Sequence, residues 1–154
     1  MVSRRKCGQL VLFAVMALAV FNLTGCGIFA PLIQSARSVG VTPSDRRNLL
    51  PEELAKFNNA LYWGSFDDAL SRTLPEAREE ILTQIRKNRE LERLVESKVD
   101  YIDYAEDAYS AKVEITTKYY RVPFYVVTDR NEQQTWKFTI SGGWKLSART
   151  IKAS

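Results

Sequence analysis

The chain has 154 residues, with 22 basic and 18 acidic side chains, no histidine and a formal net charge of +4. This length fits one small domain, and 45% hydrophobic with 26% charged residues is an ordinary globular composition. Without histidine the chain cannot use Ser-His-Asp or Cys-His catalysis or bind a metal through imidazole. Its two cysteines are too few for a four-cysteine zinc site.

The N-terminal stretch has the pattern of an export signal. Arg4, Arg5 and Lys6 precede an uninterrupted apolar run over residues 10–21. A membrane-spanning helix needs about 20 apolar residues, so this shorter run favours a signal sequence over a permanent membrane anchor. An uncleaved N-terminal anchor and a buried helix are the alternatives.

A short motif follows the apolar run: Leu23, Thr24, Gly25 and Cys26. It resembles the lipobox of bacterial lipoproteins. The resemblance implies that the Cys26 thiol carries diacylglycerol and that the chain is cut between Gly25 and Cys26, so that residues 1–25 are removed. Gly27, in place of an aspartate, implies delivery to the outer membrane with the protein facing the periplasm.

Removal of residues 1–25 changes the charge of the chain. It takes away three basic and no acidic side chains, which leaves 19 basic against 18 acidic. Export and a nearly neutral mature chain argue against nucleic acid as a partner. We expect the chain to meet the membrane through its lipid, and another envelope protein or a second copy of itself through its domain.

The residues after the lipid site are expected to form a tether over 26–48, because Pro31, Gly40 and Pro43 interrupt any periodic pattern. Residues 28–36 contain apolar side chains at helical spacing. They could lie in the membrane interface or pack back onto the domain, and the sequence favours neither.

Three helices are expected next. The first opens at Leu50 and Pro51, since proline suits the first helical position, and ends at Gly64. The second helix starts after Ser65. The third helix starts at a capping box at Thr73 and continues to about Val95. Asn88 falls on its apolar stripe, so this helix could break or bend there.

The period then changes to the alternation of strands. Strands are expected over residues 99–104, over 109–120, from about 126 to 140, and over 144–148, with turns at 105–108 and 141–143. Pro123 should end the second strand. Residues 129–132 could be strand or turn, and we favour strand.

Helices followed by an antiparallel meander indicate an α+β fold. The segment from Ala60 to Ala69, the Gln134-Thr135-Trp136 triplet and the Gly142–Leu146 stretch resemble small bacterial lipoproteins with a cystatin-like or NTF2-like domain. The resemblance implies N-terminal helices packed on a curved, mostly antiparallel four-stranded meander. We expect residues 49–154 to form this domain.

The strands carry the candidate site residues. Adjacent strand residues point to opposite faces, so Tyr119 and Tyr120 cannot both be core residues, and some aromatic surface should lie in a pocket or at a partner surface. The candidates for such a surface are Tyr101, Tyr119, Tyr120, Phe124, Tyr125, Trp136 and Trp144.

Three functions follow from these residues. The favoured one is a non-enzymatic interaction module on a lipid anchor. The alternative is a carrier of a small ligand, in a pocket between helices and sheet lined by Tyr101, Tyr119 and Trp136. An acid-catalysed enzyme using Asp100 or Asp103 is the third, because acids are the one catalytic group left and no cofactor or metal motif is present.

Overall fold

Helices come first and strands second in the computed structural model, which describes residues 39–152. The sheet order is β1-β2-β3-β4 with every neighbouring pair antiparallel, so the expected α+β meander is confirmed. Among residues 39–152 no helix has both the length and the apolar character to cross a membrane. The elements are α3 (Pro43–Trp63), α4 (Phe66–Ser71), η1 (Pro75–Ala77), α5 (Arg78–Leu91), β1 (Glu92–Tyr104), β2 (Ser110–Arg121), β3 (Val127–Thr139) and β4 (Gly143–Lys152).

Helix α3 begins seven residues before the predicted start at Leu50, so that prediction is wrong. Thr42 is the N-cap: its Oγ1 accepts a hydrogen bond from the Asp45 amide at 3.2 Å, and the Asp45 carboxylate accepts one from the Thr42 amide. Pro43 occupies the first turn, where its missing N–H costs nothing. Residues 43–48 of the expected tether therefore belong to the helix.

Pro51 lies inside α3, where it has no N–H to donate to the carbonyl of Arg47. The hydroxyl of Tyr104 donates to that carbonyl instead, at 3.0 Å. One residue earlier, Trp144 Nε1 donates to the carbonyl of Arg46 at 2.7 Å. Two side chains of the sheet thus hydrogen-bond to the helix backbone around the proline, which explains why the helix continues through it.

The end of α3 agrees with the prediction. Gly64 has a left-handed backbone with φ of 75°, and a Cβ there would approach the guanidinium of Arg89 to 2.6 Å. Arg89 Nη1 donates to the carbonyls of Leu61 and Tyr62 at 3.1 and 3.2 Å, so it caps the C-terminus of α3 from a neighbouring helix.

The third helix differs from the prediction at both ends. The side chain of Thr73 donates to the Ala69 carbonyl in the last turn of α4, at 3.1 Å, and does not cap the third helix. The 3₁₀ turn η1 precedes α5. α5 passes Asn88 and ends at Leu91, and the sheet begins at once with Glu92. The expected helical residues Leu94 and Val95 are therefore in β1.

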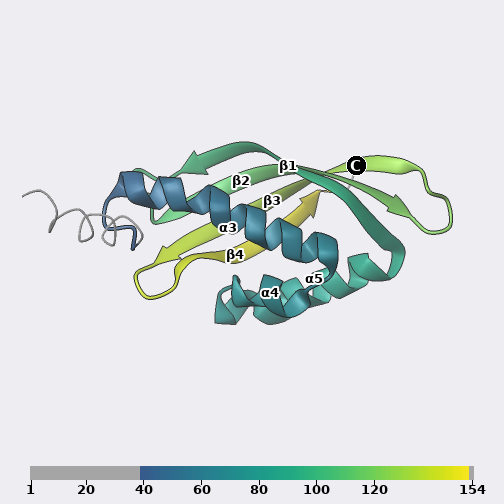
Figure 1. Cartoon of the computed structure of the whole chain (residues 1–154), viewed down its shortest axis with the longest axis horizontal. Helices are drawn as coiled ribbons and strands as arrows, with labels where there is room; N and C mark the ends of the chain where they lie inside the picture. The colour runs from purple at the N-terminus through teal and green to yellow at the C-terminus, as the bar shows by residue number, and fades with distance from the viewer. Residues whose placement is uncertain (1–38, 153–154) are drawn as a thin grey trace, which may run out of the picture. The chain divides into compact units, whose positions relative to one another are not determined.

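The sheet confirms the predicted turns at 105–108 and 141–143, and residues 129–132 are strand. α3 lies across one face of the sheet, which we call the inner face, and the β2–β3 hairpin extends past the helices (Figure 1). Strand alternation groups Ile140 with Trp136 and Phe138, and Ala148 with Trp144 and Leu146, but Ile140 and Ala148 are exposed. A register shift opposite Thr135 and Trp136 reverses the alternation after Leu146, so Arg149 points inward in place of Ala148.

The core lies between the inner face and the helices. Trp136 is fully buried and meets the ring of Phe57 edge-on, with ring centroids 5.8 Å apart. Trp144 meets Phe138 in the same way at 5.6 Å. Further core residues are Leu50, Leu54, Leu61, Ala69, Ile81, Ile85, Ala111, Val113, Ile115 and Leu146.

Candidate functional site

A cluster of buried charges occupies the inner face of the sheet beyond the apolar core. Arg130 Nε donates to Glu132 Oε1 at 2.8 Å, and Arg149 donates to Glu132 Oε2 through Nε at 2.8 Å and Nη2 at 2.6 Å. Arg130 also pairs with Glu92, whose other oxygen lies 3.1 Å from Arg121 Nη2. The side chains of Arg130, Glu132 and Arg149 are each at most 5% exposed.

The electrostatics of this cluster keep Glu132 charged. Burial alone would raise the pKa of its carboxyl, but the positive charges of Arg149 and Arg130 outweigh burial and hold the pKa below its usual range. A carboxylate held by two guanidinium groups is a weak proton acceptor at neutral pH. The arrangement therefore suits a structural ion network better than general acid–base catalysis.

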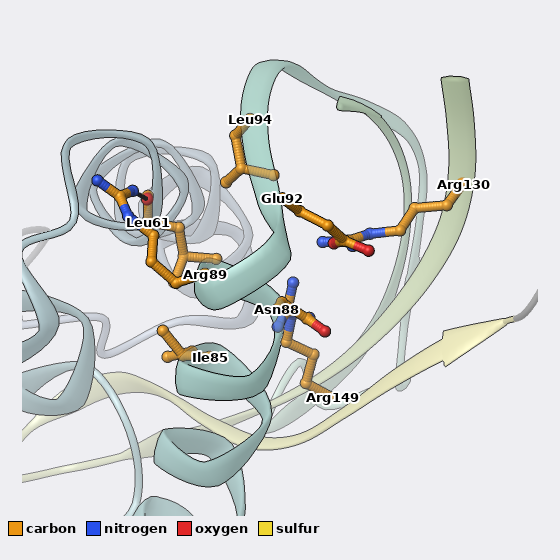
Figure 2. Close-up of a pocket in the computed structure, with 8 residues that line it drawn as sticks. All are labelled: Leu61, Ile85, Asn88, Arg89, Glu92, Leu94, Arg130 and Arg149. Atoms are coloured by element: carbon orange, nitrogen blue, oxygen red, sulfur yellow. Dashed lines mark hydrogen bonds and ion pairs between the residues drawn. The ribbon is translucent and has the colours of Figure 1, made fainter. Parts of the chain in front are cut away.

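A cavity of about 30 Å³ lies between this cluster and the end of α5. Figure 2 shows Glu92 and Arg130 pointing toward each other across it, with Asn88 and Arg149 converging from α5 and β4. The Asn88 Nδ2 atom is buried and has no hydrogen-bond partner in the structure. The volume fits one or two water molecules, and a water there would accept from Asn88.

The charged cluster was not predicted from the sequence. Strand alternation shows which residues share one face of a strand, but it does not show that buried residues on that face will be charged. Arg130 and Glu132 alternate in step with Trp136 and Phe138, so the buried face of the predicted strand already contained them. The signal that could have found them is this run of polar residues at inward positions. Arg149 could not be found in this way, because the register shift that turns it inward has no sequence signature.

A groove runs between α3 and β1, the edge strand that pairs with β2 alone in the described sheet. Two adjoining depressions, of about 280 and 290 Å³, share Asn58, Asn59 and Ser97. Glu96 is the one charged residue among those that line them. The rest of the lining is mainly apolar: Pro51, Leu54, Ala55, Tyr62, Trp63, Val95, Val99 and Ile102.

The predicted aromatic candidates do not form one site. Tyr101 is 61% exposed and pairs with Glu114 on the outer face, whereas Trp136 and Trp144 are core residues. Tyr119 faces inward, with the guanidinium carbon of Arg130 4.9 Å from its ring centroid. The structure thus does not place Tyr101, Tyr119 and Trp136 around a common pocket.

The other aromatic candidates lie near the β2–β3 turn. Tyr120 is half-buried and its ring centroid lies 5.4 Å from that of Tyr125. Phe124 and Tyr125 are 78% and 68% exposed. Tyr119 and Tyr120 point to opposite sides of the sheet, as strand alternation requires.

The two acidic candidates lie on the exposed side of the sheet. Asp100 accepts a hydrogen bond from Thr116 Oγ1 at 2.6 Å and borders a surface depression of about 210 Å³. Asp103 is exposed and pairs in register with Lys112.

Within residues 39–152, no three side chains of metal-binding type come together. Leu23, Thr24, Gly25 and Cys26 lie outside the described residues.

Comparison with known proteins defines the fold. No protein-family model and no curated protein sequence matches the chain. Its structure is similar to a SEC-C motif-containing protein from Rhodopseudomonas palustris, with a TM-score of 0.51 and 18% identity over 62% of this chain and 73% of that one. A ketosteroid isomerase-like protein from Erwinia carotovora atroseptica gives a TM-score of 0.51 and 11% identity over 68% of this chain and 94% of that one. At these identities the likeness concerns the fold alone, and the described domain has an α+β, NTF2-like fold.

Proposed function

We propose that this chain is a bacterial envelope lipoprotein whose NTF2-like domain is a non-enzymatic binding module facing the periplasm. The basic residues Arg4, Arg5 and Lys6, the apolar run and the lipobox ending at Cys26 support export and lipid attachment. Gly27 after the lipid site supports the outer membrane as the destination. The lipid holds the domain at the membrane, and the domain binds a partner there.

The groove between α3 and β1 is the observation that carries the binding role. It adjoins a sheet edge whose backbone groups can pair with another strand, and apolar side chains line it. The inner face of the sheet offers less room, because the cavity beside its charged cluster holds about 30 Å³. A pocket for a small organic ligand has roughly 300–1,000 Å³.

The chemistry of the groove indicates its partner. Glu96 is engaged by Lys118 at 3.0 Å, so the lining offers little net charge to a ligand. Asn58, Asn59 and Ser97 provide hydrogen-bonding side chains in its centre. We propose an extended, uncharged segment of another envelope protein, which adds to the edge of β1 and places alternate apolar side chains against α3.

Photocrosslinking in intact cells tests this role. A photoreactive phenylalanine at Asn59, in the groove, should give a crosslink to a discrete envelope protein, whereas the same residue at the exposed Lys137 on β3 should not. Ala55→Glu introduces a charge into the groove and should abolish the crosslink. Ala148→Glu makes the same change at an exposed alanine of β4 and should leave it intact.

Two results would contradict the binding role of the groove. One is an equal crosslinking pattern from positions 59 and 137, which would mean random contact. The other is a crosslink from position 59 that survives Ala55→Glu. Recovery of the folded Ala55→Glu protein in the membrane fraction controls for loss of the protein itself.

A further inference from the structure

The turn between β2 and β3 presents a second apolar surface, away from the groove. We call residues 122–127 the hairpin tip. Phe124 is 78% exposed, and Tyr125 and Val126 are each 68% exposed. The amide of Val122 donates to the Leu91 carbonyl at 3.3 Å, which brings the 59% exposed Leu91 beside the tip. The tip reaches beyond the helices at one end of the sheet (Figure 1).

The hairpin tip is an ordered turn. The amides of Phe124 and Tyr125 both donate to the Arg121 carbonyl, at 2.8 and 3.3 Å. The ring of Tyr125 lies against that of Tyr120. These two amides would enter the interfacial layer already hydrogen-bonded, which lowers the cost of removing them from water.

The segment that forms the hairpin tip and its flanks carries no acidic side chain of its own. No acidic residue occurs from Tyr119 to Thr128. Arg121 within this stretch pairs with the buried Glu92, but its side chain remains 61% exposed. The exposed Arg93 of β1 pairs in register with Tyr120. Tyrosine and phenylalanine rings flanked by guanidinium groups match the headgroup region of a bilayer, which is anionic in many bacterial membranes.

We propose that the hairpin tip inserts into the interfacial layer of the same bilayer that holds the Cys26 lipid. The tip is convex, and a lipid surface accepts a convex apolar wedge without a matching cavity, whereas a protein partner must supply one. The inference rests on the proposed lipid anchor, because one weak apolar contact binds a membrane stably only with a second attachment.

The segment between Cys26 and the domain is long enough for the lipid and the hairpin tip to contact the same bilayer. Phe138 and Gly40 are in contact at the opposite end of β3 from the tip, so the polypeptide enters the domain far from the tip. β3 has 13 residues and a length of roughly 40 Å. The residues between Cys26 and Val39 can extend to about 45 Å. This linker can therefore span the length of β3, so the tip can reach the bilayer while the β3–β4 turn lies away from it.

Two matched single-cysteine variants test the insertion. Val126→Cys lies in the tip, and Ile140→Cys lies in the β3–β4 turn, where the native side chain is 78% exposed. The full lipidated chain is labelled with an environment-sensitive thiol dye and reconstituted in vesicles of phosphatidylethanolamine and phosphatidylglycerol. We expect the emission at position 126 to shift to shorter wavelength and to be quenched by nitroxide-labelled lipid, while position 140 reports water. Phe124→Asp added to Val126→Cys should reverse the shift.

The experiment distinguishes failure of the proposed tip insertion from failure of the proposed lipid anchor. The wild-type chain should take up no dye, because Cys7 is removed and Cys26 is alkylated; uptake by the wild type would contradict the anchor. With an unlabelled wild type, water-like emission at position 126 would overturn the insertion. Equal shifts at positions 126 and 140 would overturn it as well, and so would a shift that requires added envelope proteins, because the tip would then bind protein.

Discussion

The two halves of the inner face of the sheet differ in chemistry although they share the same strands. Toward the β3–β4 turn, Trp136 and Phe138 pack against other aromatic rings and exclude water. Toward the β2–β3 turn, Arg130 and Glu132 occupy the equivalent inward positions and pair with Glu92 and Arg149. One alternating strand therefore builds both an apolar core and a buried ion network.

The difference shows how two kinds of burial stabilise a sheet. Burying apolar side chains lowers the free energy of the folded state, so the half of the sheet around Trp136 stabilises the domain directly. Buried charges lose hydration, and their pairing does little more than offset that loss. Removing one partner of the ion network should therefore be destabilising, because it leaves buried charges unpaired. The variants below compare that loss with the loss in the apolar half.

The largest effect is expected in the apolar half. Trp136→Ala removes a fully buried ring that contacts Phe57 and leaves a cavity. We expect the free energy of unfolding to fall by about 3–5 kcal/mol, measured by urea denaturation. A loss below about 1 kcal/mol would contradict the packing described for this half.

Breaking the ion network should cost slightly less. Glu132→Gln keeps the size of the side chain but leaves Arg130 and Arg149 buried without their shared carboxylate, and we expect a loss of about 3 kcal/mol in urea denaturation. Glu114→Gln, at a half-exposed position of β2, is the control and should change stability little. Equal losses for both variants would show that the network contributes nothing special.

The pH dependence sharpens the same test. Because the pKa of Glu132 is lower in the folded chain than the ordinary 4.5, its ion pairs contribute fully above that pH and are lost as pH falls through the folded pKa. The stability difference between wild type and Glu132→Gln should therefore be largest near neutrality and shrink below pH 4.5. A difference that stays constant to low pH would contradict ionic pairing as its source.

The smallest effect concerns the contact between the apolar half and α3. Tyr104→Phe keeps the ring beside Trp144 but removes the hydroxyl that donates to the Arg47 carbonyl. We expect thermal or urea denaturation to show a loss of about 1 kcal/mol. Tyr101→Phe, on the outer face, is the matched control, and an equal loss there would remove the role assigned to the Tyr104 hydroxyl.

The fold was predictable from local signals, with one informative failure. Gly64, Pro123 and the glycine turn at 141–143 ended elements as expected, because each acts on its own backbone. The predicted start of α3 at Leu50 was wrong because proline is favoured in the first turn of a helix, whereas Pro51 lies inside this one. The Arg47 carbonyl, which Pro51 leaves without a helical donor, accepts a hydrogen bond from the hydroxyl of Tyr104, 57 positions along the chain. Local sequence cannot show such a distant partner.

The candidate site was less predictable. Strand alternation correctly separated Tyr119 from Tyr120 and drew attention to the exposed Phe124 and Tyr125. It could not show that Trp136 would be covered by Phe57, because that depends on where α3 crosses the sheet. The groove likewise arises from the placement of α3 beside the edge of β1, a tertiary feature without a motif.

The lipid anchor is the claim on which the proposed role of the domain depends, and the intact mass of the mature protein tests it most directly. We predict that the wild-type protein purified from bacterial membranes begins at Cys26 and carries the added mass of a diacylglycerol group, while Cys26→Ser remains unprocessed and without lipid. A wild-type protein that begins at Met1, or a mass without lipid, would contradict the account.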